Sequence, residues 1–266
     1  MSSFGFIGAG NMGGTLARAA AKTNCGRIML SDRDTQKANT LAGEIHATVL
    51  DNNALLNECD YIFLGVKPQV LPSLLKEISQ ILSIRVCKPV LISMAAGISI
   101  ASIEEIVGDE YPIIRIMPNT PAGVGEGMIL YCTNSAVGEK SLSEFKMIMN
   151  AAGKLDQIDE KLIDAAGCVS GCGPAFAYMF IQSLADGGVE CGLPRDKALI
   201  YAAQTVLGAA KTVLETDRHP DRLKDEVCSP GGTTIAGVHA LEDAAMRSAV
   251  MDAVVAAYNR TLELNK

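Results

Sequence analysis

Two glycines and two threonines lie close together near the C-terminus, in an order that suits the binding of an anion. The segment from Ser229 to Thr234 reads SPGGTT, and the apolar pattern that follows it is typical of a helix. Backbone N–H groups at a helix start bind carboxylates and phosphates, and a threonine hydroxyl can hydrogen-bond a neighbouring substrate atom. Helix capping by Ser229 or Thr233 is the alternative. Because two glycines and two threonines exceed what a cap needs, we expect an anion site with hydroxyls at its edge.

A second glycine-rich loop lies near the N-terminus. Residues 8–13 read GAGNMG, so that Gly8, Gly10 and Gly13 follow the G-x-G-x-x-G pattern. The loop follows an apolar run and begins a helical pattern, which is the setting of a dinucleotide site. There the glycines allow a tight turn, close approach of a pyrophosphate and close packing of helix on strand. A plain strand-to-helix turn is the alternative, but two glycine loops in one chain favour two anionic ligands.

The end of the second predicted strand carries both an acid and a base. An acid such as Asp32 would accept hydrogen bonds from the adenosine ribose hydroxyls and favour NAD. Arg33 beside it would pair with a 2′-phosphate and favour NADP. Since both residues are present, they leave the cofactor open. In the alternative interpretation, Asp32 or Asp34 only caps the next helix.

Two further loops follow predicted strands, at the edge of a doubly wound sheet where ligands bind. Residues 66–69 read VKPQ, where Lys67 can point at a phosphate or ribose and a proline stiffens the turn. Residues 117–121 read MPNTP, where two prolines fix the loop and Asn119 offers an amide for recognition. The alternatives are a solvated surface lysine and a purely structural loop.

These loops need a scaffold of alternating strands and helices, and the first 158 residues supply one. We predict strands at 4–7, 27–31, 61–66, 90–93, 113–117 and 128–132, and helices at 11–22, 34–44, 69–82 and 100–107. Nearly continuous apolar strands that alternate with helices indicate a Rossmann-type doubly wound parallel sheet, covered on both faces. We therefore assign residues 1–158 to a dinucleotide-binding domain.

The remaining residues, 159–266, lack strand patterns and form the second predicted domain. Helices are predicted at 174–189, 194–216, 233–241 and 242–264. They are apolar around most of their circumference, which is typical of buried helices, and a domain of this size has little interior to cover them. We expect part of their surface to be buried against a second copy of the chain.

Composition and charge argue against several other classes. The 266 residues are 48% hydrophobic with a formal net charge of −7, unlike proteins that bind nucleic acids or membrane surfaces. No apolar stretch reaches the roughly 18–20 residues of a span and no signal peptide is recognisable, so we expect a cytoplasmic protein. The eight cysteines are expected to be reduced, without a metal site. No histidine has a neighbouring carboxylate that indicates a relay, and His239 is expected to pack within its helix.

Together these motifs resemble the pyrroline-5-carboxylate reductase family over essentially the whole chain. Besides the loops already described, the resemblance includes SGCGPAF at 170–176 and ADGGV at 185–189. The segment VCSPGGTTI at 227–235 is similar to the family's signature and is specific. The resemblance implies reduction of 1-pyrroline-5-carboxylate to L-proline by NAD(P)H, the last step of proline biosynthesis.

The resemblance also implies roles for individual residues. Met12, Asn52, Lys67 and Pro68 would line the cofactor site beside the glycine loop. Together with the residues singled out above, the predicted site for NADP, with NAD as the second candidate, consists of Gly8, Gly10, Asn11, Met12, Gly13, Asp32, Arg33, Asn52, Val66, Lys67, Pro68 and Asn119. Ser229, Gly232 and Thr233 would bind the substrate carboxylate, and Thr234, the candidate catalytic residue, would hydrogen-bond the ring nitrogen. The second domain would form a homodimer in which the substrate loop of one subunit faces the cofactor of the other, with a higher assembly left open.

Two positions depart from the family's pattern, and two other functions compete with it. Cys172 stands where many members have serine, and Asp32 stands where an uncharged residue is common, which leaves the NADPH preference open. A β-hydroxyacid-type NAD(P) dehydrogenase would need a catalytic lysine in the helical domain, yet none occurs between Lys161 and Lys197. A non-enzymatic dinucleotide sensor would leave the loop at 229–234 without a ligand. Both alternatives are disfavoured.

Overall fold

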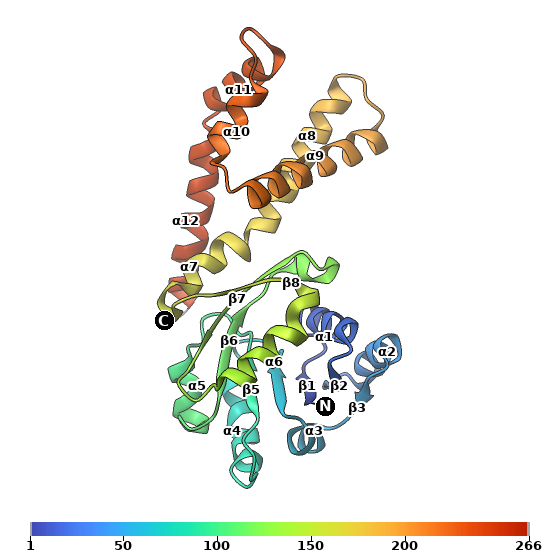
Figure 1. Cartoon of the computed structure of the whole chain (residues 1–266), viewed down its shortest axis with the longest axis vertical. Helices are drawn as coiled ribbons and strands as arrows, with labels where there is room; N and C mark the ends of the chain where they lie inside the picture. Colours follow the sequence, from blue (N-terminus) through green and yellow to red (C-terminus); the bar gives the residue numbers. More distant parts are fainter. Residues whose placement is uncertain (1, 265–266) are drawn as a thin grey trace. The chain divides into compact units, whose positions relative to one another are not determined.

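Two compact units make up the computed structural model, which describes residues 2–264. The sheet unit runs from the N-terminus to Cys172 and also takes in the end of the chain from Ala257 on. The helical unit is Gly173–Ala256. In Figure 1 the strands of the sheet unit are blue to green, and the helical unit is yellow to red.

An eight-stranded sheet with the order β3-β2-β1-β4-β5-β6-β7-β8 forms the centre of the sheet unit. Its strands are β1 (Ser2–Ile7), β2 (Gly26–Ser31), β3 (Thr48–Val49), β4 (Tyr61–Leu64), β5 (Val90–Ser93), β6 (Ile113–Met117), β7 (Gly127–Thr133) and β8 (Gly153–Gln157). Every neighbouring pair is parallel except β6 and β7. The predicted doubly wound sheet is therefore confirmed.

One strand reversal and two edge strands depart from the prediction. After β6 the chain forms a 3-10 helix, Thr120–Val124, and Gly125 follows with a φ of 82°. A parallel pair needs a crossover of a dozen or more residues, usually a helix, so this short turn makes β7 antiparallel to β6. The unpredicted strands are β3, which has two residues, and β8, which is polar and largely unburied.

Six helices of the sheet unit connect these strands, and a seventh, α7, follows the last of them. They are α1 (Asn11–Thr23), α2 (Thr35–Ile45), α3 (Asn52–Glu58), α4 (Leu71–Leu82), α5 (Ile100–Val107), α6 (Glu139–Met149) and α7 (Glu160–Ser170). The predicted α1, α2, α4 and α5 are confirmed to within two residues at each end. The unpredicted α3 begins where the Asp51 carboxylate accepts a hydrogen bond from the backbone N–H of Ala54 at 2.8 Å.

Side chains alternate along the strands between two apolar clusters, one on each face of the sheet. On one face Phe6 stacks on Phe63 with 4.3 Å between ring centroids, and α1, α2 and α6 cover them. On the other face Ile62 and Leu64 of β4 pack with apolar residues of α3, α4, α5 and α7. Both layers of helices therefore fix the strand ends, from which the candidate binding loops project.

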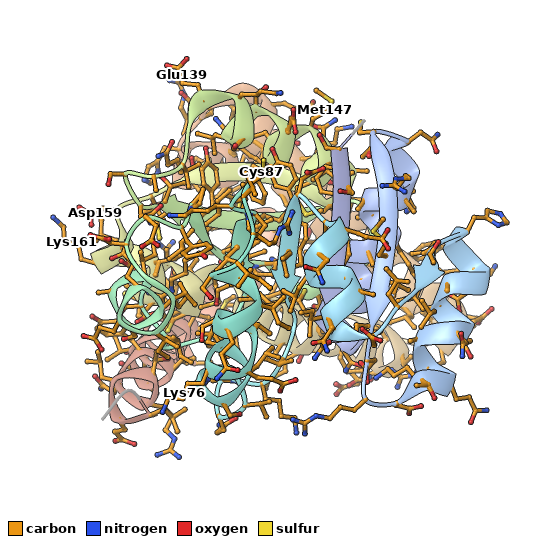
Figure 2. All side chains as sticks on the ribbon, turned by 90° about the horizontal axis from the view of Figure 1, so that it is seen from below. Lys76, Cys87, Glu139, Met147, Asp159 and Lys161 are labelled. Atoms are coloured by element: carbon orange, nitrogen blue, oxygen red, sulfur yellow. The ribbon has the colours of Figure 1, made fainter. Side chains whose placement is uncertain are left out.

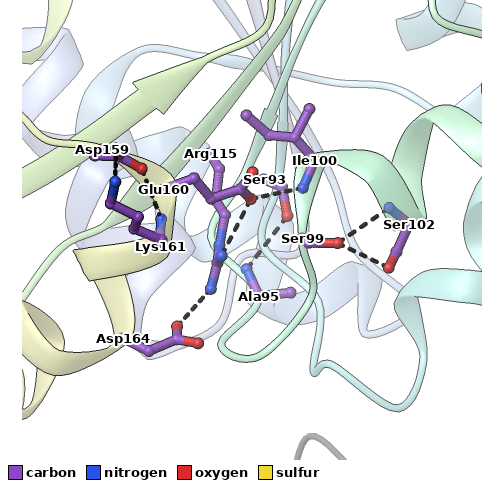
Figure 3. A network of polar contacts seen from close by, with 10 residues as sticks. All are labelled: Ser93, Ala95, Ser99, Ile100, Ser102, Arg115, Asp159, Glu160, Lys161 and Asp164. Carbon is purple, nitrogen blue, oxygen red and sulfur yellow. Dashed lines mark hydrogen bonds and ion pairs between the residues drawn. The ribbon is translucent and has the colours of Figure 1, made fainter.

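A buried arginine fastens the start of α7 to the sheet. The side chain of Arg115 on β6 is only 4% exposed, and its guanidinium lies 3.2 Å from Glu160 and 2.6 Å from Asp164. The Glu160 carboxylate also accepts a hydrogen bond from the backbone N–H of Ile100 at 2.7 Å, so it joins α7 to the first turn of α5 as well (Figure 3). These contacts pack α7 on the sheet, and the sheet unit accordingly extends to Cys172.

The helical unit is built from α8 (Gly173–Glu190), α9 (Arg195–Thr216), α10 (Pro220–Val227), α11 (Thr233–Asp243) and most of α12 (Met246–Leu264). A small cluster formed by Ala185, Ala198 and Ala202 packs α8 on α9. The helix predicted from 242 to 264 begins later than expected. Ala245 has a left-handed φ of 54°, which ends α11 and separates it from α12.

Large apolar side chains remain exposed over the helical unit. No residue of α10, α11 or α12 that the structure describes is buried. Exposed examples are Met179, Ile200, Leu207, Leu214, Met251 and Val255. On the sheet unit, Cys87 and Met147 are exposed, and the charged side chains of Glu139 and Lys76 point outward (Figure 2).

One helical stretch, Glu160–Glu190, is long and apolar enough to cross a membrane by length and composition alone, with a mean hydropathy of 1.2.

Candidate active site

A cavity of about 920 Å³ opens at the carboxyl ends of β1, β2 and β4. The strand order reverses between the neighbouring strands β1 and β4: β2 and β3 follow β1 on one side, and β5 and β6 follow β4 on the other. Doubly wound sheets bind ligands at this switch point. The lining includes Gly8, Gly10, Ser31, Asp32, Arg33, Asn52, Gly65, Val66 and Lys67. The structure thus brings together seven of the twelve residues predicted for the cofactor.

Each of the three glycines of the first loop has a different structural role. Gly8 has a φ of 101°, a conformation that disfavours other residues. A Cβ on Gly13 would lie 2.1 Å from the carbonyl oxygen of Gly8, so Gly13 lets α1 pack on β1. A Cβ on Gly10 would meet nothing within 4 Å. Gly10 therefore leaves open space at the start of α1, and no side chain caps that helix.

The two charged residues at the end of β2 have different surroundings. The Asp32 carboxylate accepts hydrogen bonds from the backbone N–H of Ala9 at 2.6 Å and of Asp34 at 2.9 Å. The N-cap of α2 is Asp34, which accepts from the N–H of Lys37 at 3.1 Å. Capping of α2, which the sequence allowed for either acid, is thus performed by Asp34. Arg33 is exposed and lines the cavity.

Asn52, Val66 and Lys67 also lie at the cavity. The side-chain oxygen of Asn52 accepts a hydrogen bond from the Ser31 hydroxyl at 2.7 Å, which fixes the orientation of its amide at the start of α3. Lys67 is exposed, and its carbonyl oxygen accepts a hydrogen bond from the N–H of Val70 in the turn before α4.

Five predicted cofactor residues do not line this cavity. Asn11 faces a smaller neighbouring cavity of about 440 Å³, and Met12 packs partly buried against an apolar cluster. Gly13 lies inside the packed loop, and Pro68 is outside the lining although Lys67 before it is included.

Asn119, the fifth of these, has a structural role that the sequence did not reveal. Its amide nitrogen donates to the carbonyl of Ser170 at 2.9 Å, and its oxygen accepts from the N–H of Met128 at 2.9 Å. The buried amide therefore joins the MPNTP loop to β7 and to the end of α7. The structure does not place this side chain among the cavity residues, in contrast to the amide recognition expected from the sequence.

The second glycine loop lies between α10 and α11 in the helical unit. Gly231 has a left-handed φ of 68°, and the N–H of Gly232 donates to the carbonyl of Ser229 at 3.0 Å. Gly232 is the N-cap of α11, and no side chain caps the helix. Because neither Ser229 nor Thr233 makes a capping hydrogen bond, the capping alternative does not describe this loop. The backbone N–H groups in the first turn of α11 present the positive end of the helix dipole.

Other reactive groups lie away from these loops. All eight cysteines are free, and burial raises the pKa of the Cys59 thiol to about 12, which keeps that thiol protonated. His239 does not pack as expected, since its side chain is 77% exposed and lies 3.3 Å from Asp243. Among residues 2–264, no group of three or more His, Cys, Asp or Glu side chains could hold a metal ion.

Sequence reasoning missed several residues of the cavity. Ser31 orients Asn52, and a Cβ on Gly65 would lie 2.8 Å from the carbonyl oxygen of Gly8. The signal for Gly65 was available, because a glycine directly after an apolar strand indicates close approach of another backbone. Nothing local marks Ser31, whose partner is 21 residues away.

The fold and the first loop define the class of NAD(P)-dependent oxidoreductases. Residues 160–264 match the family model for pyrroline-5-carboxylate reductase dimerisation, and residues 3–97 match that for NADP oxidoreductase, coenzyme F420-dependent. The reductase of Arabidopsis thaliana is 41% identical across 98% of this chain and 95% of its own length. That of Synechocystis is 46% identical across 81% of this chain and 79% of its own length. The chain belongs to the pyrroline-5-carboxylate reductase family.

Solved structures agree with this assignment. The Plasmodium falciparum pyrroline carboxylate reductase with NADP bound has a TM-score of 0.88 and 36% identity, covering 100% of this chain and 98% of its own. The Coxiella burnetii pyrroline-5-carboxylate reductase has a TM-score of 0.90 and 31% identity, covering 100% and 99%. A prephenate dehydrogenase from A. aeolicus, at 14% identity and a TM-score of 0.53, shares the fold alone.

Proposed function

We propose that this chain reduces 1-pyrroline-5-carboxylate to L-proline with NADPH. The observation that carries the proposal is the uncapped start of α11 at the loop 229–234. It occurs in a chain with 41% identity, over nearly its full length, to a reductase of that name. The sensor interpretation gives this loop no ligand, and the dehydrogenase interpretation lacks the catalytic lysine that it needs.

The first loop fits a bound dinucleotide. The empty space at Gly10 and the uncapped first turn of α1 would admit the pyrophosphate close to backbone N–H groups. Arg33 would face a 2′-phosphate, and Asn52 and Lys67 would face the rest of the nucleotide across the same cavity. For Asn119 we propose a role in holding its loop, rather than direct contact with the cofactor.

The second loop would hold the substrate. The N–H groups at the start of α11, with Ser229, Gly232 and Thr233, would bind the carboxylate, and the Thr234 hydroxyl would hydrogen-bond the ring nitrogen. Thr234 is half-buried, unlike Ser229 and Thr233, so its hydroxyl is the more restricted in orientation.

The reduction depends mainly on how the protein positions the two reactants. When bound, NADPH supplies the hydride to the imine carbon. Because the iminium forms in solution near neutral pH, the ring nitrogen arrives with its proton and no strong enzymic acid is needed. The two loops hold the reactants in the geometry of the reaction, and such positioning can lower a barrier by roughly 7–11 kcal/mol.

A homodimer would complete the site, with residues 1–158 as the nucleotide domain and 159–266 as the dimerisation and substrate domain. The exposed apolar side chains of the helical unit support this, and so do glycines inside its helices. Gly208 in α9 and Gly237 in α11 have nothing within 4 Å of a Cβ position. A glycine inside a helix costs about 1 kcal/mol relative to alanine, and close approach of a partner helix would account for them. We propose a cytoplasmic enzyme in which the apolar stretch Glu160–Glu190 does not cross a membrane: α7 packs on the sheet, and the exposed apolar side chains of α8 belong to the dimer interface.

The direct test is NADPH oxidation by the purified protein, which should depend on added 1-pyrroline-5-carboxylate. Thr234→Ala should lower kcat/KM about 10- to 100-fold, because a hydrogen bond to a charged group contributes about 1.5–3 kcal/mol. Thr234→Ser keeps the hydroxyl and should stay within about threefold of the wild type. Absence of turnover with both NADPH and NADH would refute the function, and equal rates for the two variants would remove Thr234 from its role.

A further inference from the structure

We propose that Asp32 is a positioning residue that fixes the first glycine loop, and that it does not select between NADH and NADPH. This inference rests on the proposed use of a nicotinamide dinucleotide. It reverses the expectation from the sequence, where an acid at the end of the second strand favours NAD.

Two adjacent hydrogen bonds join the glycine loop to the end of β2. The N–H of Gly8 donates to the carbonyl of Ser31 at 2.7 Å, and the N–H of Ala9 donates to the carboxylate of Asp32 at 2.6 Å. Ala9 is buried, so no water competes freely for its N–H, and a hydrogen bond to an ionised carboxylate is about twice as strong as a neutral one. Asp32 thus holds the loop between Gly8 and Gly10 in one shape before a ligand arrives.

The second carboxylate oxygen is engaged as well. Asp32 Oδ1 accepts from the N–H of Asp34 at 2.9 Å, which fixes the turn into α2. An acid that selects NADH must direct its oxygens at the ribose hydroxyls and must repel a 2′-phosphate. Here one backbone N–H points at each oxygen, which directs the carboxylate toward its own backbone and offsets part of its negative charge.

The neighbouring base is placed differently. Arg33 is exposed, lines the cavity and has no ion pair within the part of the chain that the structure describes. Its charge is therefore available to an anion, whereas the charge of Asp32 is committed to the loop. Selection for the 2′-phosphate would then depend on Arg33, and Asp32 would affect both dinucleotides alike, through the shape of the loop that receives their common pyrophosphate.

The test measures dissociation constants of NADPH and NADH by fluorescence titration of the purified full-length protein without substrate. Asp32→Asn keeps the size of the side chain but replaces one accepting oxygen with an N–H₂ group. Both constants should rise by about three- to tenfold, because the loop loses its preorganisation, and their ratio should stay within threefold of the wild-type value. Asp32→Ala, with no acceptor, should raise both at least as much.

Arg33→Ala is the matched comparison in the same turn, and it should raise the constant for NADPH more than that for NADH. A change of more than threefold in the ratio with Asp32→Asn would overturn the proposal, because that is the signature of a selecting acid. Unchanged constants would also overturn it, since a residue that only stabilises the fold would leave binding to the folded protein intact. Because the titrations contain no 1-pyrroline-5-carboxylate, a failure of the proposed reaction would not affect them.

Discussion

Replacing Arg115 with methionine would remove the buried cation that Glu160 and Asp164 of α7 share. The guanidinium makes two charge-assisted hydrogen bonds, to Glu160 and Asp164, and each such bond contributes about 1.5–3 kcal/mol. Both carboxylates are partly exposed, at 31% and 21%, so water would solvate them in the variant. We therefore expect a loss near the lower limit for breaking a buried ion pair, about 3 kcal/mol.

Thermal unfolding would measure this loss. For a chain of this size, 1 kcal/mol corresponds to about 2–4 °C, so Arg115→Met should lower Tm by about 6–12 °C. Wild type and variant must be compared at one protein concentration, because dimerisation makes Tm depend on concentration. Glu160→Gln is the control, since it leaves the shorter contact between Arg115 and Asp164 in place, and its Tm should fall by less than half as much.

The ion-pair reasoning would be wrong if Arg115→Met melted within about 2 °C of the wild type. That result would mean that the cost of burying the guanidinium cancels its attraction to the two carboxylates.

Two further predictions concern the glycine loop and acid stability. Gly10→Ala should keep the wild-type Tm, because its Cβ meets nothing within 4 Å. It should nevertheless raise the dissociation constant of NADPH about tenfold or more, because the added Cβ obstructs the pyrophosphate. Gly13→Ala should lower Tm as well, and the opposite pattern for the two variants would contradict these roles of the two glycines. Hydrogen bonds from Ser2 and Tyr61 hold the pKa of the Glu144 carboxyl below its usual value, so its stabilising effect is present above the unfolded-state pKa and is lost as pH falls through the lowered folded-state value. Urea midpoints should therefore show the gap between wild type and Glu144→Gln closing from neutral pH to about pH 3, and a constant gap would count against this assignment.

Features encoded by neighbouring residues were predictable from the sequence. The strand at 90–93 and the helix at 100–107 match the structure at both ends, because their apolar patterns are strong and a serine at 99 caps the helix. The pattern Gly8, Gly10, Gly13 predicted the first loop for a similar reason, since Gly8 and Gly13 meet local requirements of the backbone.

Features that depend on distant partners were not predictable. The amide of Asn119 bonds to Ser170, 51 residues away, and the carboxylate of Asp32 bonds to Ala9, 23 residues away. A sequence shows that these side chains are polar, but not which backbone groups the fold brings to them. The strand β8 was missed for a related reason, because its polar residues form an edge whose pairing is set by β7.

The return of the chain to the sheet unit at Ala257 changes what a single cut in the backbone would do. The helical unit is connected to the sheet unit twice, after Cys172 and before Ala257. Close to these crossings, Cys168 of α7 and Thr261 of α12 lie 3.8 Å apart from sulfur to oxygen. A protease that nicks the glycine-rich crossing at 171–173 would leave two fragments held together only by the non-covalent packing of the end of α12 on the sheet unit. Excision of the helical unit without any residues of the sheet unit therefore requires two cleavages, one at each crossing.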